Sequence, residues 1–141
     1  MKESDFISVV IPCYNDGPFL PETIQKLKEQ TYQHFEIIIV NDGSTDPQTL
    51  TILETLSKDQ TITILHKENG RMSSARNYGV RHAKGTIIAA LDADDYFHSS
   101  FFEQGLRKFD QNPRIAVVTS YIKMFGERTV TPLPNRAGTG G

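Results

Sequence analysis

Short apolar runs alternate along the chain with segments of helical periodicity, and this order constrains the fold more than any other feature. Ile7 to Ile11 and Ile37 to Val40 are rich in β-branched residues and end at turn-forming residues, which is typical of strands buried on both faces. Between them, Leu20, Ile24 and Leu27 recur at helical spacing. Similar runs predict three more strands, at 61–65, 86–91 and 114–119. This order predicts an α/β fold with an open, mostly parallel sheet and helices on both faces.

Caps and apolar stripes predict the remaining helices. Asp46 before Pro47 resembles an N-cap followed by a proline in the first turn, and Ser73 or Ser74 is expected to cap the next helix. The stripes expected to face the core are Leu50, Leu53 and Leu56, then Ala75, Tyr78, Gly79, His82 and Ala83, then Phe102, Leu106 and Phe109.

Bulk properties predict one domain that neither binds nucleic acid nor spans a membrane. Residues 1–125 are expected to form the domain, and 126–141, with two prolines, four glycines and no apolar period, a loop or disordered tail. A net charge of −2 gives no field that would attract nucleic acid. The single cysteine and the lack of a long apolar run favour a cytoplasmic protein without a transmembrane segment, which would meet the inner face of a membrane only through its substrate.

Polar clusters follow three of the predicted strands. The first contains Pro12, Tyr14 and Asn15, the second Asp42, and the third runs from Asp92 to Asp95. Ligands of open parallel sheets bind beyond the carboxyl ends of the strands, so the three clusters are expected to converge on one crevice. An aromatic ring can stack on a base and a carboxylate can accept from a base N–H, while paired carboxylates and phosphate oxygens suit Mg²⁺ or Mn²⁺. The pattern predicts a nucleotide site with a metal.

Each motif also has a simpler explanation. The acidic cluster can be a solvated turn, Asp42 can belong to an ordinary turn before Gly43, and Tyr14 can be core packing. Arg76 is predicted in the first turn of a helix, where a cation opposes the helix dipole, so an anionic partner would explain it better than the helix does. Cys13 is expected to be buried packing and not a nucleophile.

The clusters together resemble the family 2 glycosyltransferases of GT-A fold. The resemblance rests on segments in the family's order: 8–15, Gln30-Thr31-Tyr32, 35–46, 74–79, Gly85 and 91–95. It covers about residues 6–120. Asn41 stands where many members of the family have a second Asp, a small departure that leaves the implied role of Asp42 intact.

The resemblance implies the role of each site residue. Tyr14 would stack on the uracil of a uridine-diphosphate sugar, and Asp42 would accept from its N–H. Arg76 would lie near the base or diphosphate, Asp92 would contact the ribose or sugar, and Asp94 would bind Mn²⁺ or Mg²⁺. The implied activity is inverting transfer of a hexosyl group, with the metal stabilising the departing diphosphate.

The resemblance also implies that the general base lies outside this chain. Members of the family continue beyond the acidic motif into an acceptor-binding half, so no catalytic base is assigned here and the acceptor is left open. A nucleotide-sugar-binding module without catalysis is the alternative. A receiver domain would need acids after the first strand, and a dinucleotide enzyme would need Gly-x-Gly-x-x-Gly there; neither pattern is present.

Overall fold

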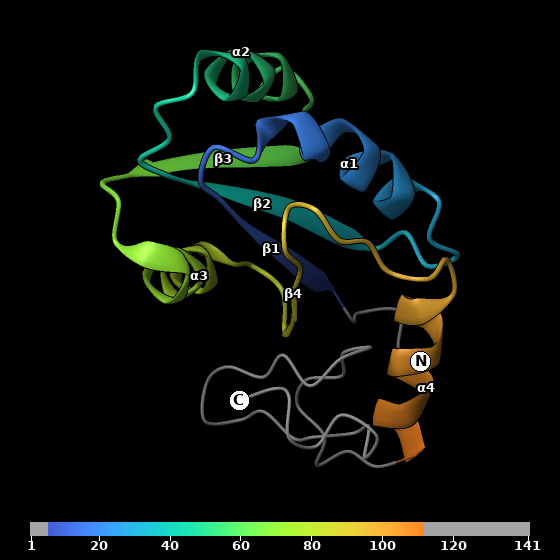
Figure 1. Cartoon of the computed structure of the whole chain (residues 1–141). Helices are drawn as coiled ribbons and strands as arrows, with labels where there is room; N and C mark the ends of the chain where they lie inside the picture. The colour runs from blue at the N-terminus through green and yellow to red at the C-terminus, as the bar shows by residue number, and fades with distance from the viewer. Residues whose placement is uncertain (1–5, 112–141) are drawn as a thin grey trace.

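The computed structural model describes residues 6–111, and they form a four-stranded parallel sheet (Figure 1). Its strands are β1 (Ile7–Cys13), β2 (Phe35–Asp42), β3 (Ile62–Lys67) and β4 (Ile87–Ala90). They lie in the order β3-β2-β1-β4, with β1 paired in parallel to both β2 and β4. The predicted strand at 114–119 and the predicted tail at 126–141 lie outside the described residues.

Helices cover both faces of the sheet, as predicted. The 3₁₀ turn η1 (Gly17–Phe19) leads into α1 (Leu20–Lys28), and α2 (Pro47–Leu56), α3 (Arg71–His82) and α4 (Phe101–Gln111) follow. Figure 1 shows α1 and α2 above the sheet and α3 below it. No helix within residues 6–111 has the length and apolar content needed to cross a bilayer.

Two apolar clusters hold these layers together. The larger one joins alternate residues of β1, such as Val9 and Ile11, to α1, α2 and α4. The smaller one joins Val10, Ile38 and Val40 to Ala75 of α3 on the opposite face. Alternate residues of β1 therefore face opposite layers, and both layers are apolar. This explains why apolar residues follow one another along the strand instead of alternating with polar ones.

The local predictions were confirmed at α2 and wrong at the start of α3. The Asp46 carboxylate accepts from Thr49 N at 2.9 Å and caps α2. Leu50, which was expected to face the core from this helix, is instead 43% exposed. Helix α3 begins at Arg71 after the N-cap residue Gly70, not at a serine cap. The Gly70 N–H is bound at 2.9 Å by the Asp42 carboxylate, a long-range contact that local capping rules do not detect.

The remaining stripes agree with the prediction where side chains are described, except at His82, which was expected to face the core. Phe102 and Leu106 of α4 are buried, and Ala75 and Gly79 of α3 are buried with Tyr78 and Ala83 packed beside them. His82 is exposed, with its Nδ1 2.9 Å from the Tyr78 carbonyl oxygen. The side chain of Phe109 lies outside the description.

Gly79 sets how closely α3 approaches the sheet. A Cβ at this position would lie 2.5 Å from Val10 Cγ1 and 3.0 Å from Val40 Cγ2. Alanine normally stabilises a helix by up to about 1 kcal/mol relative to glycine, whereas forcing a methyl group into a packed core costs roughly 1–3 kcal/mol. We expect Gly79→Ala to lower the free energy of unfolding by about 1–2 kcal/mol in urea denaturation. Ser73→Ala, exposed on the same helix, is the control and should stay within about 0.5 kcal/mol; an equally stable Gly79→Ala protein would contradict the close packing.

Candidate functional site

The loops after β1 and β2 are joined to each other by Asn15. Its backbone N–H donates to Ser44 Oγ at 2.9 Å, and its side-chain Oδ1 accepts from Thr45 N at 2.8 Å and Asp46 N at 2.9 Å. Asn15 has a φ of 57°, a conformation that Asn adopts more readily than most residues. The predicted binding residue Asn15 therefore holds two of the three clusters together.

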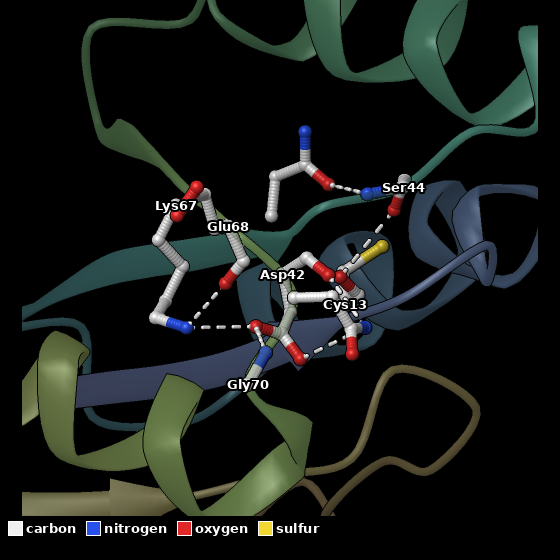
Figure 2. A network of polar contacts seen from close by, with 8 residues as sticks. Cys13, Asp42, Ser44, Lys67, Glu68 and Gly70 are labelled. Atoms are coloured by element: carbon white, nitrogen blue, oxygen red, sulfur yellow. Dashed lines mark hydrogen bonds and ion pairs between the residues drawn. The ribbon is translucent and has the colours of Figure 1, made fainter.

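Asp42 ends β2 and is almost fully enclosed, with 1% of the residue exposed. Its Oδ1 accepts from Lys67 Nζ at 3.0 Å and from Gly70 N at 2.9 Å, as Figure 2 shows. Asn69 Nδ2 donates to the main-chain oxygen of Asp42 at 3.0 Å and lies 3.5 Å from Oδ2. Oδ1 is thus engaged by two close donors, while the contact to Oδ2 is at the limit of a hydrogen bond.

The turn after Asp42 requires a glycine. Gly43 has a φ of +75°, and a Cβ there would lie 2.7 Å from Asn69 N. A side chain at this position would strain the backbone and displace the segment that carries Asn69 and Gly70. The simple turn explanation of this motif and its role in shaping the Asp42 site are therefore both valid.

The acidic turn follows Leu91, directly after β4. Carboxylate oxygens of Asp92, Asp94 and Asp95 lie within 4.8 Å of one another, and Asp95 N donates to the Asp92 main-chain oxygen at 3.0 Å. Asp94 is exposed and the other two acids are half-buried. Clustered carboxylate oxygens are the donor type that Mg²⁺ and Mn²⁺ prefer, so the residues present fit such a cation.

Arg76 joins α3 to the acidic turn. Its Nη2 lies 3.7 Å from Asp92 Oδ1, and both side chains are about one quarter exposed. The predicted location in the first helical turn was wrong, because α3 begins five residues earlier, at Arg71. The helix dipole therefore does not explain the position of Arg76, whereas the neighbouring carboxylate does.

Sequence reasoning missed Asp16 as part of this edge. Burial raises the pKa of the Asp16 carboxyl, and the negative charges of Asp94 and Asp92 raise it further, against a backbone hydrogen bond from Tyr14. The first loop therefore lies close enough to the acidic turn for their charges to interact. The available signal was the position of Asp16 two residues after Tyr14, in the loop that follows the first predicted strand. Asp16 adds a further carboxylate to the negative charge at this edge.

The aromatic and apolar residues of the first cluster are divided between surface and core. Tyr14 is 42% exposed, so its ring is not core packing. Pro12 is buried in β1 opposite Val40, which excludes a broad contact between its ring and a ligand. Cys13 is fully buried, and burial raises the pKa of its thiol, which agrees with a packing role.

Comparison with known proteins places this arrangement in a family. The sequence model described as "Glycosyl transferase family 2" matches residues 8–139. Uncharacterized glycosyltransferase EpsJ from Bacillus subtilis (strain 168) is 37% identical over 122 residues, which cover 86% of this chain and 36% of EpsJ. Glycosyltransferase GlyG from Streptococcus pneumoniae serotype 4 is 36% identical over 119 residues, covering 84% of this chain and 40% of GlyG. The chain thus spans well under half the length of these relatives.

Solved structures show the same fold. TarS 1–349 from S. aureus, in complex with UDP, superposes with a TM-score of 0.65 at 27% identity, covering 76% of this chain and 32% of TarS 1–349. Mannosyltransferase PcManGT from Pyrobaculum calidifontis, in complex with GDP-Man and Mn²⁺, superposes with a TM-score of 0.66 at 25% identity, covering 77% of this chain and 33% of PcManGT. The sheet, the family match over almost the whole chain and these GT-A structures together show that the chain belongs to glycosyl transferase family 2.

Proposed function

We propose that this chain is the donor-binding part of an inverting, metal-assisted glycosyltransferase that uses a uridine-diphosphate sugar. The observation that carries the proposal is the gathering of an enclosed carboxylate, Asp42, and an acidic turn at one edge of a GT-A sheet. Relatives of the same fold bind UDP or GDP-Man, and the second was solved with Mn²⁺. The proposed domain is 1–125, and the proposed location is the cytoplasm.

Each site residue has a separate proposed task. The exposed ring of Tyr14 stacks on the base, and Asp42 accepts from the base N–H. Arg76 lies near the base or diphosphate, which its position beside Asp92 supports. Asp92 contacts the ribose or sugar, and Asp94, the exposed member of the acidic group, binds the metal.

The remaining two residues of the first cluster, Pro12 and Asn15, hold its backbone in place. Asn15 holds the loops after β1 and β2 in place through its side-chain oxygen. Pro12, which is buried in β1 one residue before the strand ends, helps to fix the backbone that leads to Tyr14.

A bound divalent cation would supply a Lewis acid that stabilises the negative charge developing on the departing diphosphate. The chain's own contribution is to hold Asp94 and its neighbours where they ligate this ion, and to orient the donor through the base. We assign no general base among the described residues. This chain matches 36% of the length of EpsJ and 32% of TarS 1–349. We propose that acceptor binding and proton removal belong to the part of such family members that this chain does not match.

The contacts of Asp42 favour uracil over other bases. Two close donors already engage Oδ1, so Oδ2, with only the 3.5 Å contact to Asn69, keeps the greater capacity to accept a further hydrogen bond. Uracil presents one N–H at N3 and needs one acceptor. Guanine presents two adjacent N–H groups to the same edge, and cytosine presents an acceptor at N3, which would oppose the carboxylate.

Titration calorimetry of the chain with UDP, GDP and CDP in the presence of Mn²⁺ tests this proposal. An unpaired buried polar group costs roughly 1–3 kcal/mol, so we expect UDP to bind at least about tenfold more tightly than CDP, and also more tightly than GDP. Equal affinities for UDP and CDP would contradict the role of Asp42. Tighter binding of GDP would transfer the proposal to guanosine-diphosphate sugars.

A further inference from the structure

Thr23 connects α1 directly to the acidic turn. Its residue is 2% exposed, and its Oγ1 lies 2.6 Å from the main-chain oxygen of Ala93 and 3.0 Å from that of Phe19. A hydroxyl has one proton, so the shorter contact, to Ala93, is the one in which Thr23 donates best. Figure 1 shows the loop after β4 running beside α1, in agreement with this contact.

Ala93 lies between Asp92 and Asp94, so the Thr23 contact reaches the centre of the acidic turn. The carbonyl that Thr23 binds belongs to the peptide unit leading into Asp94, so fixing its direction also fixes the backbone from which the Asp94 carboxylate extends. The Ala93 side chain is itself buried in the cluster that contains Leu20 and Ile24 of α1. The acidic turn is therefore anchored at its centre, while its acids are half-buried or exposed.

A second polar contact from the same region anchors the following segment. Gln30 is 3% exposed; its Nε2 donates to the main-chain oxygen of His98 at 2.6 Å, and its Oε1 accepts from Phe102 N at 3.1 Å. This contact holds the entry to α4 and does not involve residues 92–95. Gln30 therefore offers a control for loss of buried hydrogen bonds outside the acidic turn.

We propose that Thr23 is a positioning residue that sets the affinity of the acidic turn for a divalent cation. This inference rests on the proposed function, in which Asp94 binds the metal. Groups that orient metal ligands through a hydrogen bond typically change metal affinity by roughly 10–100-fold when removed. The Thr23 hydroxyl acts through the backbone, at one residue from the ligand, so an effect near the lower end of this range is expected.

The test compares Thr23→Val, Thr23→Ser and Gln30→Met with the unchanged chain. For each protein, calorimetry measures UDP affinity with Mn²⁺ and with chelator, and thermal unfolding measures stability. Valine keeps the shape of threonine without its donor, so we expect the ratio of the two affinities to fall about tenfold in Thr23→Val. Serine keeps the hydroxyl and should preserve the ratio. Gln30→Met should lower the melting temperature yet keep the ratio of the unchanged chain.

The outcomes separate the two proposals. If the unchanged chain shows a Mn²⁺ effect and Thr23→Val shows the same one, the role of Thr23 is overturned while the proposed function stands. Equal losses in Thr23→Val and Thr23→Ser, or in Gln30→Met, would also overturn it, because the hydroxyl contact to Ala93 would not be the cause. A chain without any Mn²⁺ effect overturns the metal site and this inference together. If Thr23→Val does not fold, Thr23→Cys replaces it, since a thiol of similar size is a weak donor.

Discussion

Asp94→Ala is expected to remove the Mn²⁺-dependent part of UDP binding, with an affinity loss of roughly 100-fold or more when measured with Mn²⁺. Loss of a group that only hydrogen-bonds to a metal ligand already lowers metal affinity by roughly 10–100-fold, and Asp94 is proposed as a direct ligand. With chelator present, the same variant should bind UDP no more weakly than the unchanged chain, because it lacks one charge that repels the diphosphate. Calorimetry under both conditions measures the two effects.

The same substitution should slightly stabilise the metal-free fold. Burial raises the pKa of Asp16 in the folded state and the charge of Asp94 raises it further, so ionised Asp16 costs stability at neutral pH, and this cost disappears as pH falls below about 4, the unfolded value. We expect Asp94→Ala to raise the free energy of unfolding at pH 7 by less than about 1 kcal/mol, because these groups are screened by solvent. The gain should vanish at low pH.

Asp59, far from the acidic turn in sequence, supplies a control in which the folded-state pKa is lowered instead of raised. The hydrogen bond from Lys28 and those from Thr61 lower the pKa of Asp59 to about 2, so its contribution to stability is present above about 4 and is lost as pH falls toward 2. Asp59→Asn should therefore lower stability at pH 7 and leave the Mn²⁺ effect on UDP binding unchanged.

A Mn²⁺ effect on UDP binding that survives in Asp94→Ala would contradict the assignment of Asp94 as the metal ligand.

The fold was predictable because its signals are local. Runs such as Ile37 to Val40 cannot remain exposed, and the helical stripe of Leu20, Ile24 and Leu27 covers them at short connection lengths. The N-cap at Asp46 is likewise a contact between residues three positions apart. Each of these features depends on neighbours in sequence, so pattern and composition were sufficient.

The details of the site were less predictable because they depend on contacts across the chain. Asp42 reaches Gly70, Thr23 reaches Ala93, and Asp16 interacts with Asp94. No periodicity reports such distances. The start of α3 was misplaced for this reason, since the backbone N–H of its N-cap residue, Gly70, is bound by a side chain from β2, and no serine caps the helix. Asp92 and Arg76 were both named from sequence, but only the structure brings them together.

Asp42→Asn is expected to weaken UDP binding by at least about tenfold and to lower the free energy of unfolding by about 2–3 kcal/mol. The neutral side chain loses the charge that pairs with Lys67, and breaking a buried ion pair typically costs 3–5 kcal/mol. The cost should be lower here because the Lys67 side chain is 16% exposed and its Nζ also donates to the Glu68 main-chain oxygen at 2.6 Å. Calorimetry and urea denaturation measure the two losses.

A double-mutant cycle with Lys67→Met separates the structural role of Asp42 from its role in binding. Lys67→Met alone leaves the enclosed Asp42 carboxylate without its cation, so it should also be destabilising, while Oδ2 can still accept from uracil. In Asp42→Asn with Lys67→Met no unpaired charge is left, and we expect much of the lost stability to return. UDP affinity should stay low in this double variant, because the base N–H no longer meets a carboxylate. If binding recovers together with stability, Asp42 holds the fold of the β2 turn and does not select the base.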